Sequence, residues 1–256
     1  MKISLVIPSI HPENWLSLFQ GMQASCLKNS FEIIFVGPYP IPSELSGFNN
    51  VKYIKDLGCP SRCLQLGSTI AEGTFLSWCS DDCQIQPGAF DEAIETFEQN
   101  LTDSDGINLL YSEGENFTGT QHLEKSYWIG YTHPDLRCPG VNPEWSLAII
   151  FLYKRHTFYK FGGVDCRFEH ANMNLHDLAF AIQNSGGKII NSKSLMFKFN
   201  FNPNVHREEY RPVYSAYLQN DGPLFKSLYQ DPQAASKRAV SMDNWRNQDS
   251  VWKRRF

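Results

Sequence analysis

Two adjacent acids, Asp81 and Asp82, have the type and the position to do chemistry. They follow residues 75–78, a short apolar run with the length and composition of a buried strand, and no other acid lies between Phe75 and Pro87. Carboxylate oxygens are ligands that Mg²⁺ and Mn²⁺ prefer, so the pair is a candidate site for a divalent cation. The alternative is that the pair caps a helix that begins near Pro87.

The elements that must position this pair alternate regularly through the first part of the chain. Apolar runs predict strands at residues 3–7, 31–36, 51–54, 75–78 and 107–111. Helical spacing predicts helices at residues 12–27 and 61–71 and a further helix from Pro87. This alternation is typical of the α/β class, in which helices cover both faces of a mostly parallel sheet and ligands bind at the carboxyl ends of the strands.

The pattern changes after residue 112. Residues 112–144 are rich in Gly, Pro and aromatic residues and exceed the length of an ordinary connection, which predicts a functional loop or an inserted hairpin. A strand at 147–153, a Gly162-Gly163 turn, a helix at 175–184 and a strand at 188–190 follow, with helical fragments beyond Pro203. We therefore divide the chain into residues 1–112 and 113–202, two halves of one domain, and a C-terminal helical extension, residues 203–256.

Composition narrows the range of partners. A net charge of -4 over 256 residues gives no basic surface overall, so we expect no nucleic-acid partner. The longest apolar run, residues 147–153, is far shorter than the roughly 20 residues that a membrane-spanning helix needs. The apolar start is broken by Pro8 and lacks a cleavage site, and the seven cysteines are an odd number, so we expect a cytoplasmic chain with reduced thiols.

The order of these pieces resembles the GT-A glycosyltransferases, in particular the inverting enzymes of family 2. The similar segments extend over most of residues 1–200: Ser4 to Ser9, Ser61 to Gly67, Ala71 to Leu76, Ser80-Asp81-Asp82, Pro87, Phe161 to Asp165, and His176-Asp177. Their order and spacing, rather than any single segment, carry the resemblance. It implies a GT-A fold and transfer of a sugar from a nucleotide-sugar donor to a hydroxyl group.

The resemblance implies a metal site. Asp82 takes the place of the second acid of the family's Asp-x-Asp motif, whereas Ser80 stands where the first acid would be. In the family the acids hold Mn²⁺ or Mg²⁺, which neutralises the diphosphate and stabilises the departing nucleotide. We expect Asp82 to bind the metal, Asp81 to support it near the metal or the ribose, and His206 to be a further ligand; the alternative for His206 is an ordinary surface histidine.

The resemblance also implies a nucleotide site that includes Pro8 and Ser9. Arg62 takes the place of an arginine that lies near the nucleotide or orders the acidic loop, and its alternative is a surface residue. Where relatives often carry acids that hold the base, this chain has Gly37-Pro38-Tyr39, so the base is left open. Tyr39 is a candidate to stack on the base and Asp56 to accept a hydrogen bond from it, and both have the alternative of ordinary loop residues.

On the acceptor side, inverting transfer needs a base that removes the proton of the attacking hydroxyl. Asp177, expected near the start of its helix, takes the place of the second member of the family's acid pair, and His176 replaces the first. An acid placed there by the helix dipole is the alternative, and Asp165, Glu169 and His170 are other candidates for the base. Trp128 and Trp145, beside Tyr131, are expected to form a wall on which the acceptor sugar stacks, or else to belong to the core.

The sequence thus predicts a metal-dependent, inverting glycosyltransferase of hexosyltransferase type, with a nucleotide-sugar donor and a glycan, lipid-linked or protein acceptor. Two alternatives stay open. Because Ser80, Gly37 and His176 stand where acids are common, the chain can instead be a degenerate module of the same fold that binds a glycan, a nucleotide or a protein without turnover. A nucleotidyltransferase is less favoured, since no Gly-rich phosphate loop with a lysine follows the first strand.

Overall fold

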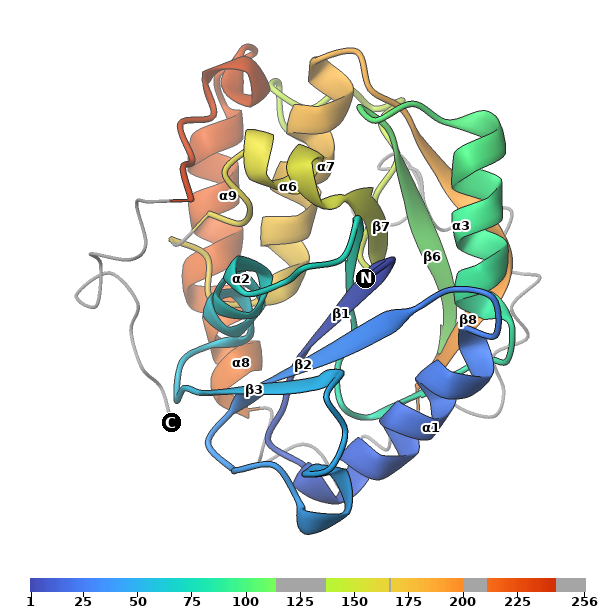
Figure 1. Ribbon diagram of the computed structural model, residues 1–256. Coiled ribbons are helices and arrows are strands. Elements are labelled where there is room, and N and C mark those ends of the chain that lie inside the picture. Colours follow the sequence, from blue (N-terminus) through green and yellow to red (C-terminus); the bar gives the residue numbers. More distant parts are fainter. Residues whose placement is uncertain (114–136, 166, 200–210, 243–256) are drawn as a thin grey trace.

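An eight-stranded sheet with the order β3-β2-β1-β4-β7-β6-β8-β5 runs through the molecule (Figure 1). The computed structural model describes residues 1–113, 137–165, 167–199 and 211–242. The strands are β1 (Ile3–Pro8), β2 (Phe31–Gly37), β3 (Val51–Lys55), β4 (Phe75–Trp78), β5 (Cys83–Ile85), β6 (Gly106–Glu113), β7 (Phe151–Lys154) and β8 (Ile189–Phe199). Six of the eight run in one direction, and β5 and β7 run in the other.

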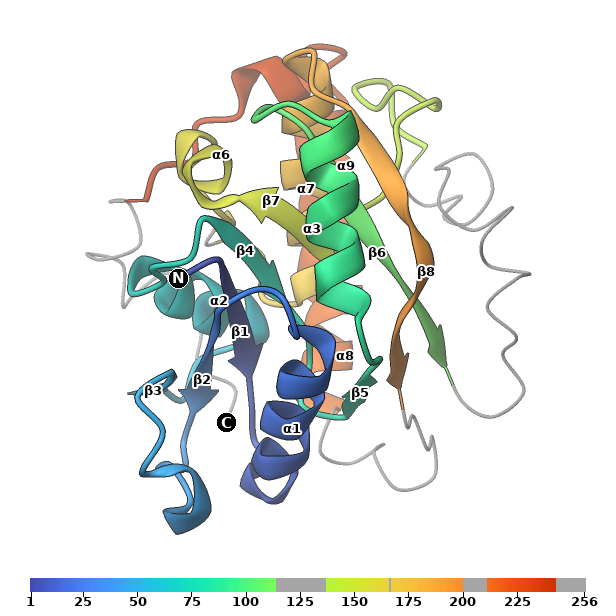
Figure 2. The same ribbon diagram turned by 45° about the vertical axis from the view of Figure 1, so that its right-hand side comes forward.

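Helices cover both faces of this sheet (Figures 1 and 2). The α-helices are α1 (Trp15–Ser25), α2 (Pro60–Thr69), α3 (Ala89–Asn100), α6 (Arg155–Lys160), α7 (Ala171–Asn184), α8 (Arg211–Ala216) and α9 (Gly222–Tyr229). A π-helix (Tyr217–Asp221) joins α8 to α9, and 3₁₀ turns form at Pro12–Asn14, Ser43–Leu45 and Ala234–Lys237. The predicted α/β class is confirmed.

The sheet is buried on both faces because its central strands alternate between two apolar cores. In β1, Ile3, Leu5 and Ile7 pack with α1 and α3, whereas Val6 packs on the opposite face with α2 and α7. Burial on both sides explains why these strands are continuous apolar runs in the sequence rather than alternating ones. A third apolar cluster joins α7 to α9, where Phe180 packs against Phe225 and Tyr229.

Several boundaries differ from those that the sequence predicts. The strand predicted at 147–153 is shorter at its start, because β7 begins at Phe151, although Leu147 and Ala148 are buried. The helix predicted at 175–184 begins at Ala171, because the His170 side chain accepts a hydrogen bond from the backbone N–H of Asn172 and so caps the first turn. The expected placement of Asp177 at the start of its helix is therefore wrong.

The strand β6 lies between two strands that come later in the chain. It pairs with β7 in antiparallel fashion and with β8 in parallel fashion. The strand β5, which the sequence did not predict, has β8 as its one neighbour among the described strands. Residues on either side of position 112 thus share one sheet.

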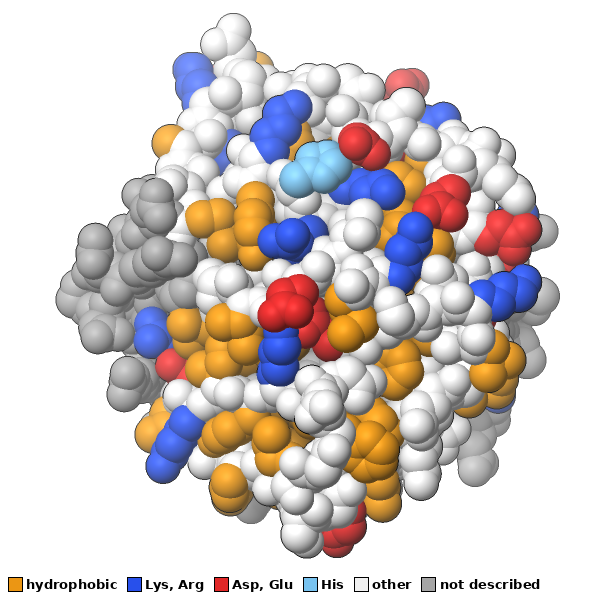
Figure 3. All heavy atoms as spheres, viewed as in Figure 1, with side chains coloured by type: hydrophobic (Ala, Val, Ile, Leu, Met, Phe, Trp, Pro, Cys, Tyr) orange, Lys and Arg blue, Asp and Glu red, His pale blue; other side chains and the backbone are white. Residues whose placement is uncertain are grey.

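Charges are mixed on the face seen in Figure 1. Figure 3 shows lysine and arginine side chains interspersed with acids and with hydrophobic side chains on this face. Across the described ranges, no helix combines the length and the apolar character needed to cross a membrane.

Candidate functional site

A cavity of about 1010 Å³ opens at the carboxyl ends of the strands. Pro8 and Ser9 line it where β1 ends, Gly37 where β2 ends, and Ser80, Asp81 and Asp82 just after β4. The start of α7 forms another wall with His170, Ala171 and Asn172. This is the edge of an α/β sheet at which ligands bind.

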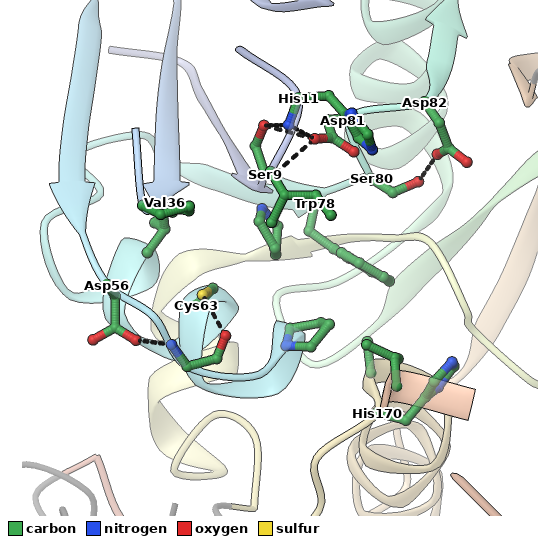
Figure 4. A pocket seen from close by; sticks show the side chains of 18 of the residues that line it. Ser9, His11, Val36, Asp56, Cys63, Trp78, Ser80, Asp81, Asp82 and His170 are labelled. Atoms are coloured by element: carbon green, nitrogen blue, oxygen red, sulfur yellow. Dashed lines mark hydrogen bonds between the residues drawn. The ribbon is translucent and has the colours of Figure 1, made fainter. Parts of the chain in front are cut away.

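Asp81 holds the loop that follows β1. Its Oδ2 accepts hydrogen bonds from Ser9 Oγ at 2.7 Å, from the Ile10 backbone N–H at 2.9 Å and from the His11 backbone N–H at 2.8 Å (Figure 4). Burial raises the pKa of this carboxyl group, and the hydrogen bonds from Ser9 and His11 oppose that shift. Asp81 therefore shapes the cavity wall by joining the ends of β4 and β1.

Asp82 is more accessible than Asp81. The Asp82 side chain is half-buried, accepts a hydrogen bond from Ser80 Oγ and lines the cavity. Among the described residues, no three His, Cys, Asp or Glu side chains come together as a group that could hold a metal ion. A cation at this position would take one carboxylate from Asp82 and other oxygens from a bound phosphate, a donor set that Mg²⁺ accepts.

Arg62 and Asp56 form an ion pair beside the cavity. Arg62 Nε lies 3.1 Å from both carboxylate oxygens of Asp56, and the Gly58 backbone N–H donates to Asp56 Oδ1 at 2.6 Å. Asp56 lines the cavity, whereas Arg62 lies behind it on α2 and is 8% exposed. The alternative of Arg62 as a surface residue is therefore wrong.

Glycines allow the backbone to come close at this edge. A Cβ atom on Gly37 would lie 1.8 Å from the carbonyl oxygen of Ser9, and a Cβ on Gly58 would lie 2.3 Å from Arg62 Cδ. The absence of an acid at position 37 thus follows from the close approach of β2 to the loop after β1. Tyr39, two residues further on, lines the cavity and is 47% exposed.

Asp177 lies in a different environment. It is 3% exposed, and its Oδ1 accepts a hydrogen bond from the Tyr229 hydroxyl at 2.8 Å. Its Oδ2 pairs with Arg238, whose guanidinium also donates to the backbone carbonyls of Phe161 and Gly163. Six residues into α7, Asp177 faces the C-terminal segment, and the structure does not bring it to the cavity.

Among the other candidates for the base, only His170 lines the cavity. Asp165 is paired with Arg167 at 2.6 Å, and Glu169 is 4% exposed. The sequence named His170 only as an alternative, and it gave no clear signal for this placement, because histidine is not among the residues preferred as helix caps.

The structure brings Tyr39 to the cavity, but Trp145, which the sequence selected for the acceptor wall, lies elsewhere. Trp128 and His206 lie outside the described residues. Trp145 packs on Phe180 with ring centroids 5.4 Å apart, within the third apolar cluster. The aromatic residues that line the cavity are Trp78, Tyr111, Phe199, Tyr217 and Tyr39.

Two of these aromatic residues come from the ends of neighbouring strands. Tyr111 on β6 and Phe199 on β8 meet edge to face at 5.3 Å. Tyr111 could have been found in the sequence, because it ends the strand predicted at 107–111, whereas the strand predicted at 188–190 stops well short of Phe199.

Acidic side chains outnumber basic ones on the described wall of the cavity. Its described lining includes the carboxylates of Glu13, Asp56, Asp81 and Asp82 and contains no lysine or arginine. An anionic ligand would need a compensating cation at such a wall.

Sheet order, helix placement and the cavity at the strand ends define an α/β fold of the glycosyltransferase type. The similarity is to solved structures of TarS, a glycosyltransferase from S. aureus. One TarS structure matches with a TM-score of 0.57 and 15% identity over 86% of this chain, which spans 40% of the TarS chain. A shorter TarS structure matches with a TM-score of 0.58 and 14% identity over 91% of this chain and 70% of the other.

A third TarS structure, in complex with UDP-GlcNAc, matches with a TM-score of 0.55 and 13% identity over 91% of this chain and 72% of the other. No protein-family model and no curated protein matches the sequence. At these identities the likeness establishes the fold.

Proposed function

We propose that the protein is a glycosyltransferase that binds a nucleotide-sugar donor in the cavity at the carboxyl ends of β1 to β4. The observation that carries the proposal is that two polar groups line one cavity. Asp56, which is held by Arg62, forms the first group, and Ser9, Asp81 and Asp82 form the second. The likeness in fold to TarS, which has been crystallised with UDP and with UDP-GlcNAc, supports it.

The base of the nucleotide would lie near Asp56 and Tyr39. An ionised carboxylate only accepts hydrogen bonds, so Asp56 suits a base that presents an N–H, such as N3–H of uracil. The ion pair with Arg62 fixes the orientation of this acceptor. The half-exposed ring of Tyr39 offers a face for stacking, and we propose uridine as the nucleoside.

The diphosphate would lie near Asp82. Because the described lining holds four acids and no lysine or arginine, two added phosphate charges require a cation. Asp82 would hold Mn²⁺ or Mg²⁺ with one carboxylate, and the bound metal would offset the charge that develops on the departing nucleotide. The Ser80 hydroxyl, which donates to Asp82, would orient that carboxylate.

Transfer to a hydroxyl group with inversion is part of the proposal and rests on the resemblance in sequence. It requires a base near the attacking oxygen. We do not assign this role to Asp177, because both of its oxygens are engaged by Tyr229 and Arg238 and it does not line the cavity.

Isothermal titration calorimetry with UDP, GDP and CDP, each with Mn²⁺ and with EDTA, tests the donor site. We expect UDP to bind in the presence of Mn²⁺ and to bind more weakly, or not at all, in EDTA. UDP release from UDP-GlcNAc is then measured with and without candidate glycan acceptors. Binding of none of the three nucleotides would overturn the proposal, and UDP binding without turnover on any nucleotide sugar would favour the non-catalytic module.

A further inference from the structure

His170 stands at the cavity wall in a fixed position at the start of α7. Its Nδ1 accepts a hydrogen bond from the backbone N–H of Asn172 at 3.1 Å, which makes His170 the N-terminal cap of the helix. A neutral imidazole has one nitrogen that accepts and one that donates. With Nδ1 accepting, the proton of a neutral His170 ring is assigned to Nε2, the nitrogen farther from the backbone.

Burial keeps this ring neutral. Enclosure of the imidazole lowers the pKa of His170 to about 4, so the uncharged form prevails near pH 7. Tyr217 contacts the ring itself, whereas Asp221 contacts the backbone N–H of His170. The edge-to-face contact with the Tyr217 ring, at 5.4 Å between centroids, limits the orientation of the imidazole.

Asp221 holds the backbone of His170 through a hydrogen bond. Asp221 Oδ2 accepts from the His170 backbone N–H at 2.6 Å, and Oδ1 accepts from the Glu169 N–H at 3.0 Å. Asp221 is fully buried at the end of the π-helix, and Asn220 Nδ2 donates to its Oδ1 at 2.8 Å. The C-terminal helices therefore fix the position from which the His170 ring meets the cavity.

We propose that His170 is a neutral hydrogen-bond donor that directs its Nε2–H to an oxygen atom of the bound nucleotide sugar, and that Asp221 is the residue that positions it. The inference rests on the proposed donor site. Figure 4 shows His170 across the cavity from Ser9, Asp81 and Asp82. The recognised oxygen belongs either to the diphosphate or to a hydroxyl of the sugar, since both accept hydrogen bonds.

The same geometry argues against His170 as the base of the reaction. A base would need its lone pair on Nε2, and the proton would then have to sit on Nδ1. That tautomer breaks the hydrogen bond to Asn172 and leaves the first turn of α7 without its cap. Because the described wall contains no lysine or arginine, an oxygen-rich ligand must be recognised there by uncharged donors such as His170 or by a bound cation.

Two substitutions separate the two nitrogens of the ring. Asn carries its amide oxygen where His carries Nδ1, so His170→Asn keeps the helix cap and removes the Nε2–H. His170→Gln places an amide N–H near the position of Nε2 and loses the cap. His156→Asn is the matched control, because His156 lies on α6, away from the cavity, with a side chain that is 60% exposed.

Calorimetric titration with UDP and with UDP-GlcNAc, both with Mn²⁺, gives the first test. We expect His170→Asn to weaken binding about 5- to 20-fold, the range for one lost hydrogen bond to a polar or charged ligand. His170→Gln should stay within about threefold of the wild type, and His156→Asn should bind as the wild type does. A loss seen with both ligands assigns the donor to the diphosphate, and a loss seen only with UDP-GlcNAc assigns it to the sugar.

Unchanged affinity of His170→Asn for both ligands, with the wild type binding normally, overturns the inference and leaves the proposed function intact. A wild type that binds neither ligand overturns the proposed function instead. In that case ¹⁵N NMR of the histidine side chains still tests the assignment, because His170 should show an unprotonated Nδ1 and a protonated Nε2 in the free protein. The opposite tautomer would overturn it.

A double-mutant cycle tests the role of Asp221. Asp221→Asn should weaken UDP-GlcNAc binding about threefold or more in the wild-type background and have no such effect in the His170→Asn background. A purely structural residue would weaken binding equally in both, and that result would remove Asp221 from the proposal.

Discussion

Arg62 places its Nε 3.1 Å from each carboxylate oxygen of Asp56, and the two side chains are only 10% and 8% exposed. A pair this deeply enclosed has lost most of its hydration, so each partner depends on the other. The Gly58 N–H completes the set of donors around Asp56. The pair therefore contributes both to folding and to the shape of the cavity in which we propose that the nucleotide binds.

Arg62→Ala is expected to weaken UDP binding about tenfold and also to lower the melting temperature, because it leaves Asp56 buried without its cation. Arg62→Lys keeps the positive charge but not the planar guanidinium, so its affinity for UDP should lie between that of the wild type and that of Arg62→Ala. Calorimetry and thermal unfolding on the same samples measure both effects. Arg62→Ala with unchanged UDP affinity would show that Asp56 does not contact the base.

Asp82→Asn is expected to abolish the difference between UDP binding in Mn²⁺ and in EDTA, at a cost of about 10- to 100-fold in affinity with Mn²⁺. The half-buried side chain at position 82 should tolerate the change without loss of stability. Asp103→Asn is the control, since Asp103 is exposed and precedes β6 at the opposite end of the sheet. Metal dependence that survives in Asp82→Asn would exclude Asp82 as the ligand.

Asp177→Asn is expected to destabilise the protein rather than to remove a catalytic group. It breaks a pair with Arg238 in which both side chains are 5% exposed, a loss on the order of 3 kcal/mol, or roughly 6–12 °C in melting temperature. The affinity for UDP should stay within about twofold, because Asp177 does not line the cavity. An unchanged melting temperature combined with lost transfer activity would return Asp177 to the role of base.

The environment of Glu32 allows us to predict how the stability of the folded protein depends on pH. Burial acts to raise its pKa, but hydrogen bonds from Lys52, Ser4 and the Glu72 backbone N–H lower it below the usual 4.5. A carboxyl group with a lowered pKa in the folded state stabilises that state above its unfolded pKa, and this stability is lost as the pH falls through the folded pKa.

We therefore expect the melting temperature to fall as the pH is lowered from about 5 toward 3, and to fall less steeply in Glu32→Gln. Glu95→Gln, at an exposed position on α3, is the control and should keep the wild-type slope. Equal slopes for Glu32→Gln and the wild type would mean that Glu32 does not contribute to the acid sensitivity.

The α/β class and the position of the acidic loop could be predicted from the sequence, because strands buried on both faces appear as unbroken apolar runs. The strand β4 has the predicted bounds, Phe75–Trp78. The start of α7 could not be predicted from apolar periodicity, since the cap that fixes it is a histidine, an uncommon residue in that position. Because α7 begins at Ala171, Asp177 lies within the helix and faces the C-terminal segment rather than the cavity.

Contacts with the C-terminal segment could not be predicted from the sequence either. The partners of Asp177 lie 52 and 61 residues further along the chain, at Tyr229 and Arg238. The positioning role proposed for Asp221 depends on a contact of the same kind, 51 residues from His170. No local pattern encodes separations of this length.

The place of β6 between β7 and β8 has a consequence for the order of folding. While a nascent chain has emerged only as far as residue 113, β6 has neither neighbour, and β4 lacks its partner on one side. Only the parallel group of β1 to β4 can assemble early, and β5 must wait for β8, more than 100 residues later. Such long separations slow folding and leave strand edges open to other chains. We therefore expect fragments that end before β8 to aggregate, and the sheet to close only once both later strands have been synthesised.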